Sequence, residues 1–197
     1  RTLRNEGAIV DLGSTSYGYS VDLNGAAVLD LAGGTLASRT NYGWTDHGNN
    51  SGNSDSFQIT GRGSIIEGKF RVGSTNLQLA DGLALTGTLS LDGATTTASG
   101  ALAMGTLAIS SGSLTISNSG TLNASLSMSG GTLDGTGTLT LTGTDNTWTG
   151  GTMTGGGTTT VASGATLNIG GGSSYVNLGD RTLRNEGAIV DLGSTSY

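Results

Sequence analysis

Residues 1–17 read RTLRNEGAIVDLGSTSY, and residues 181–197 repeat these seventeen letters without a change. The two copies lie 180 positions apart in a chain of 197 residues. Seventeen consecutive identities cannot arise by chance in a chain of this size. We therefore predict a tandem array in which residues 1–180 are one repeat and residues 181–197 begin the next identical repeat.

A shorter pattern recurs between the two copies, in which a glycine is followed by apolar residues at alternate positions. The intervals are 24, 25, 25, 27 and 23 residues for the series Gly63, Gly87, Gly112, Gly137, Gly164 and Gly187. Strands this short are stable only beside other strands. The spacing predicts an all-β fold, a parallel β-solenoid of the right-handed β-helix type, with coils of about 20–25 residues.

Two other folds fit the sequence less well. Glycine interrupts every candidate helix, and no 3.6-residue apolar period persists over ten residues. A β-sandwich predicts longer strands and more aromatic side chains than the 5% found here. The near-constant interval therefore favours the solenoid.

Composition excludes several classes of partner. The net charge is −6 and the pI is near 4.4, which argues against nucleic acid and anionic lipid surfaces. The chain has no cysteine for disulfides or thiolate metal sites and no proline to interrupt a strand ladder. No apolar run of about 18 residues is present, so we expect no membrane insertion.

Residues 41–57 break the pattern as a polar stretch rich in glycine and asparagine, and we predict a loop that leaves the solenoid. Its candidate contact residues are Tyr42, Trp44, His47 and Phe57, which could bind a glycan or a partner protein, or cover the side of the solenoid. For Trp148 the sequence leaves two possibilities open, stacking at an exposed position or packing at a corner.

Charged residues are sparse, and nothing in their spacing predicts catalysis. A lyase or glycosidase built on a solenoid needs grouped carboxylates, yet only Asp92, Asp134 and Asp145 are charged between residues 82 and 179. His47 is the only histidine, which makes a metal site improbable. We expect no catalytic, cofactor or metal residues. The charged residues of the two copies are candidates for an inter-repeat junction: Arg1, Arg4, Glu6, Arg181, Arg184 and Glu186.

The phrases LRNEGAIVDL, ISNSGTLNAS and VASGATLNIGG resemble the repeats of bacterial β-helix surface proteins. These include filamentous-haemagglutinin-like exoproteins, autotransporter passenger domains and giant repetitive adhesins. The resemblance covers most of the chain outside residues 41–57. It implies a β-helix at the cell surface or outside the cell, and no catalytic motif.

These observations lead to two main hypotheses. The first is a structural repeat of a long extracellular filament or stalk, whose partners are copies of itself stacked along the axis or bundled side by side. The second is an adhesin passenger that binds a glycan, a cell surface or a partner protein through the loop at 41–57. An enzyme is a third, weaker alternative.

Overall fold

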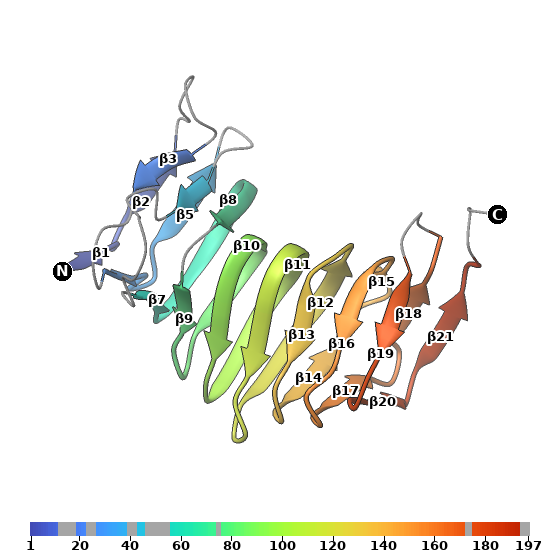
Figure 1. Cartoon of the computed structure of the whole chain (residues 1–197). Helices are drawn as coiled ribbons and strands as arrows, with labels where there is room; N and C mark the ends of the chain where they lie inside the picture. Colours follow the sequence, from blue (N-terminus) through green and yellow to red (C-terminus); the bar gives the residue numbers. More distant parts are fainter. Residues whose placement is uncertain are drawn as a thin grey trace.

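The structure is a computed structural model that describes residues 1–11, 19–22, 27–38, 43–45, 56–73, 76–171 and 175–193. These residues form a sheet of 21 strands without a helix, and the pairings between the strands are parallel. Figure 1 shows the coils stacked along one direction, with the N-terminus and the C-terminus at opposite ends of the stack. The predicted fold class, an all-β parallel solenoid, is confirmed.

The strands form three ladders, which we call the first, second and third ladders in the order in which the chain first visits them. Because the ladders alternate along the chain, three successive strand segments complete one coil.

The first ladder consists of β1 (Thr2–Arg4), β4 (Val28–Asp30), β7 (Ser56–Thr60), β9 (Asn76–Leu79), the last part of β10 (Ala84–Ala98), the last part of β11 (Ala101–Ile116), β13 (Thr132–Asp134), β16 (Gly151–Met153) and β19 (Val176–Leu178).

The second ladder consists of β2 (Ala8–Asp11), β5 (Thr35–Ser38), the first parts of β8 (Arg62–Gly73), β10, β11 and β12 (Thr121–Met128), then β14 (Thr138–Leu141), β17 (Thr158–Val161) and β20 (Thr182–Asn185).

The third ladder consists of β3 (Tyr19–Asp22), β6 (Gly43–Thr45), the last part of β8, the middle parts of β10 and β11, the last part of β12, then β15 (Asn146–Trp148), β18 (Thr166–Ile169) and β21 (Ala188–Asp191).

Coil length varies along the stack. Thr121 pairs with Thr138, 17 positions later, and Thr138 pairs with Thr158, 20 positions later. The coil at the N-terminal end is longer, since Thr2 pairs with Val28. The glycine interval of 24 or 25 residues is therefore longer than a central coil. Gly87 lies between the second- and third-ladder parts of β10, whereas Gly112 lies between the third- and first-ladder parts of β11, one coil and one corner further along the chain.

Side chains alternate between the interior and solvent, because successive residues of a strand point to opposite faces. In β12 the buried positions are Leu122, Ala124, Leu126 and Met128. Like positions stack from coil to coil, so that Leu122 lies beside Leu139. Each fully buried leucine contributes about 2 kcal/mol of transfer free energy relative to exposure.

Buried asparagine side chains join successive coils at the corners. Asn146 is fully buried, and its Nδ2 donates to the carbonyl oxygens of Thr142, Gly143 and Thr166 at 2.9–3.1 Å. Its Oδ1 accepts from the amide of Leu126 at 2.7 Å. A buried amide with all its hydrogen bonds satisfied holds three coils in register.

The structure corrects the prediction for one aromatic residue, Phe57, and decides between the two possibilities left open for another, Trp148. Phe57 does not lie on a contact loop, because it is 2% exposed in β7, where its side chain belongs to the core. Trp148 is not exposed for stacking, because it is also 2% exposed and pairs with Met128 and Ile169 in the third ladder. Both side chains face inward because the strand alternation places them there.

Part of the loop predicted at residues 41–57 is strand. Gly43–Thr45 form β6, which pairs with β3 and β8, and Ser56 begins β7. Val28 pairs with Gln58, 30 positions later, so the extra length of this coil falls between β4 and β7. The remaining part of the predicted loop between β6 of the third ladder and β7 of the first, residues 46–55, lies outside the described residues.

Candidate assembly interface

The two copies of the seventeen-residue segment use opposite edges of their strands. In the first copy, β1 pairs with β4 and β2 pairs with β5, both of which follow in the chain. In the second copy, β20 pairs with β17 and β21 pairs with β18, both of which precede it. One sequence therefore accepts a neighbouring coil on either side.

The strand pairings seen in the two copies can be placed together on a single copy of the segment. Thr182, which pairs with Thr158, is the same position of the segment as Thr2, which pairs with Val28. In a copy with neighbours on both sides, the threonine at this position would therefore pair with the equivalent of Thr158 on one edge and with the equivalent of Val28 on the other. Because each edge has its own observed register, the two sets of pairings do not compete.

Apolar columns are continuous across the combined register. Ile189 pairs with the buried Leu167, and Ile9, its counterpart in the first copy, pairs with the buried Leu36. Ile9 and Ile189 are each partly buried against the core. A neighbour on the second side would complete the burial of this isoleucine and extend the core without a gap.

The described parts of the two copies make the same local contacts at positions 4–7 of the segment. Arg4 Nε lies 2.6 Å from Glu6 Oε1, and Arg184 Nη2 lies 2.6 Å from Glu186 Oε1. The amide of Gly7 donates to Asn5 Oδ1 at 3.2 Å, and the matching distance at Gly187 is 3.1 Å. These contacts therefore form whichever neighbouring coil is present.

Arg181 is the most heavily bonded side chain at the C-terminal end. It precedes β20 at a corner between the first and second ladders and is 2% exposed. Its Nε donates to Thr159 Oγ1 at 2.7 Å. The rest of the guanidinium donates to four carbonyl oxygens of the two preceding coils: Gly135 at 3.0 Å, Thr154 at 3.3 Å, and Gly137 and Thr158 at 3.1 Å each.

Burial sets the electrostatics of this arginine. Loss of hydration lowers the pKa of Arg181 to about 10, and the negative charge of Asp134 partly opposes that shift. The side chain is therefore still charged at neutral pH, and its hydrogen bonds are charge-assisted. Arg1 occupies the same position in the first copy but is exposed, since the described residues provide no preceding coil for it.

The first copy makes the complementary contacts in the other direction. Asn5 is buried, and its Nδ2 donates to the carbonyl oxygen of Thr35 in the next coil at 2.9 Å. Arg4 Nη1 lies 2.8 Å from Asp30 Oδ2 in that coil. Asn185, the counterpart of Asn5, is exposed. The arginine at position 1 of the segment thus bonds backward, and the residues at positions 4 and 5 bond forward.

Both ends of the stack expose apolar side chains. At the N-terminal end, Leu3 is 52% exposed, whereas its counterpart Leu183 is partly buried. At the other end Leu178, Val190 and Leu192 are exposed by 41–55%. Exposed apolar side chains on open strand edges are typical of surfaces that pair with another chain.

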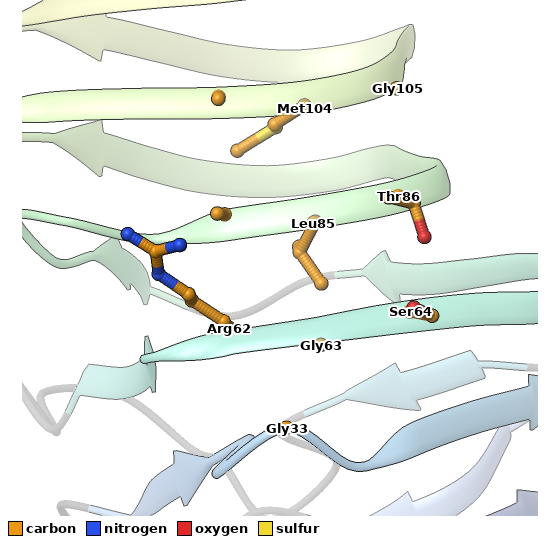
Figure 2. A pocket seen from close by; sticks show the side chains of 10 residues that line it. Gly33, Arg62, Gly63, Ser64, Leu85, Thr86, Met104 and Gly105 are labelled. Carbon is orange, nitrogen blue, oxygen red and sulfur yellow. The ribbon is translucent and has the colours of Figure 1, made fainter.

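A separate open groove of about 490 Å³ lies over the second ladder, and Figure 2 shows it with Arg62, Leu85 and Met104 along its wall. Among its lining residues Arg62 is the only one with a charge. The groove exists because the neighbouring positions hold glycine, alanine or short polar side chains. It lacks the pair of carboxylates that glycoside hydrolysis requires.

Two of the described aspartates accept hydrogen bonds from backbone amides at corners. Asp134 Oδ1 accepts from the amide of Gly135 at 2.6 Å, and Asp81 Oδ1 accepts from the amide of Ala101 at 2.8 Å. Within the described ranges, no three His, Cys, Asp or Glu side chains gather closely enough to hold a metal ion. Asp134 therefore accepts within its own turn, and Asp81 joins its corner to the next coil.

The remaining sequence candidates are only partly placed. Tyr42 and His47 lie outside the described residues, and Trp44 is described as part of β6 without its side chain. Of the six predicted junction residues, Arg4 and Glu6 form one ion pair, Arg184 and Glu186 form another, Arg181 is buried, and Arg1 is exposed. Asn5 was missed, although its place before Gly7 in an Asn-x-Gly turn was visible.

No family model matches this chain, and no curated protein or solved structure matches it either. None of the described segments is a helix of the length and apolarity that crossing a membrane demands.

Proposed function

We propose that this chain is a structural repeat of a long extracellular filament or stalk in which β-solenoid repeats continue end to end, without catalysis. One observation supports it above the others: an identical segment pairs forward at one end of the chain and backward at the other, in registers that fit together. The resemblance of LRNEGAIVDL and related phrases to bacterial surface β-helices supports the extracellular location.

The mechanism is mechanical. Each open edge exposes unpaired amide and carbonyl groups, and the next coil satisfies them. A parallel ladder that passes through every junction distributes an axial load over many hydrogen bonds, and the stacked apolar columns exclude water along the axis. The buried arginine also fixes the register, because its five hydrogen bonds form only when the two preceding coils are stacked in the correct register.

The test uses residues 1–180, whose C-terminal edge lacks the second copy. In this fragment the carbonyl oxygens that Arg181 occupies are open to Arg1 of another molecule. We expect residues 1–180 to associate head to tail into rods, and the Arg1→Met variant to associate much less. The measurement is sedimentation velocity with negative-stain electron microscopy, after circular dichroism has shown that both proteins are folded.

The chain of 197 residues is the matched control, because its own Arg181 already fills that position. It should associate less than residues 1–180 at the same concentration. A folded 1–180 fragment that remains monomeric at high concentration would contradict the proposal.

A further inference from the structure

The two copies of the segment do not lie on the same face of the solenoid. β1 belongs to the first ladder, whereas β20, which has the same sequence, belongs to the second. Likewise β2 belongs to the second ladder and β21 to the third. The second copy therefore lies one face further around the solenoid than the first.

The ladders give the size of this step. The first ladder runs from β1 to β19 through β4, β7, β9, β10, β11, β13 and β16, which is eight coils. The next strand in the chain is β20, on the second ladder. The 180-residue offset therefore corresponds to eight coils plus one face, not to a whole number of coils.

The segment tolerates this change of face. Its arginine–glutamate pair and its Asn-x-Gly turn have nearly the same distances on both faces. Ile9 on the second ladder and Ile189 on the third both pack against the core. The corners consist mainly of glycine and small polar residues. The same segment therefore fits on any of the three faces.

We propose that successive repeats of the filament are turned by one face, about a third of a turn, and rise by about 40 Å, so that every third repeat faces the same way after about 120 Å. This inference rests on the proposed function, since it concerns how one repeat continues into the next. A side chain that points outward in one repeat then points in three directions in three successive repeats.

The rotation has a structural consequence. If one repeat bends or makes a lateral contact in one direction, the next repeat does so in a direction turned by about a third of a turn. Three successive repeats therefore cancel each other's curvature, and the filament presents the same set of surfaces all around. A second filament or a flat surface would meet an equivalent side chain every 120 Å or so.

The test uses a chain of six consecutive repeats with one gold cluster per repeat. The chain has no cysteine, so Ser127→Cys on the exposed side of β12 gives a single attachment point. Electron microscopy of single filaments then measures the axial interval at which the gold returns to the same side.

We expect the gold to advance by about 40 Å per repeat and to return to the same side every third repeat, apart from any twist of the solenoid itself. Gold that lies on one side in every repeat would overturn the one-face rotation and leave the filament intact. Gold on separated globules with irregular spacing would instead overturn the proposed function. The same substitution in the 197-residue chain, labelled once, verifies folding and attachment.

Discussion

Arg1 and Arg181 are the same residue of the same segment, yet one is exposed and the other is buried with five hydrogen bonds. Asn5 and Asn185 differ in the opposite sense. Since the local sequence is identical, the neighbouring coil alone causes each difference. The comparison teaches that this segment carries two interfaces, of which each copy uses one.

The largest difference is expected at Arg181. Arg181→Met removes the donor and leaves buried carbonyl oxygens without partners, at a cost of about 3 kcal/mol in the free energy of unfolding. Arg1→Met, at the exposed counterpart, should cost at most about 1 kcal/mol, because interactions of exposed charged side chains are weak. Urea denaturation of the 197-residue chain measures both, and equal losses for the two variants would contradict the contrast.

A second matched pair is Gly187 and Gly7. A Cβ at Gly187 would overlap the backbone carbonyl oxygens of Ala162 and Ala165, whereas a Cβ at Gly7 meets nothing within 4 Å. Gly187→Ala should therefore cost about 2 kcal/mol, and Gly7→Ala close to nothing. Thermal unfolding of the two variants distinguishes them. A harmless Gly187→Ala would mean that β21 does not stack closely on β18.

The asparagine pair tests the forward interface. Asn5→Ala removes the hydrogen bond to Thr35 and one to Gly7, and should cost about 1–2 kcal/mol. Asn185→Ala removes only the bond to Gly187 and should cost a few tenths of a kcal/mol. In the asparagine pair the first copy should show the larger loss of stability, whereas in the arginine pair the second copy should. Lower stability of one end of the solenoid therefore cannot explain both results.

The smallest difference concerns the exposed ion pairs. Arg4 meets both Glu6 and Asp30, whereas Arg184 meets Glu186. Arg4→Ala should lower stability only slightly at low salt, and the loss should disappear in high salt because Arg4 and Glu6 are mostly exposed. A loss that does not depend on salt would show that the arginine acts through packing instead.

Much of this architecture could be predicted from the sequence. The alternation in stretches such as TLNASLSM requires strands with one buried face, and the frequent glycines require tight corners. The duplication also pointed to the two end coils, where the buried Asn5 and Arg181 lie. Coil length was harder, because a glycine followed by alternating apolar residues marks a strand on any of three faces, and the interval between such glycines need not be a coil.

The direction in which a side chain faces at a corner could not be predicted. Arg181 carries a charge, and arginine is rarely buried unless its donors are satisfied. Its acceptors are carbonyl oxygens of corners 23 to 46 positions away, which no local pattern reveals. Phe57 and Trp148 looked available because polar residues surround them in sequence, but the alternation of their own strands places both inside.

The most direct test of a ladder that continues through the junction is hydrogen exchange at the Asn185 amide. In the first copy the equivalent amide, that of Asn5, donates to the carbonyl oxygen of Asp30 at 2.8 Å. When residues 18–180 are appended to the chain and the junction is labelled for NMR, exchange at Asn185 should slow by a factor of at least about 100. An unchanged exchange rate in a folded two-repeat chain would contradict the account.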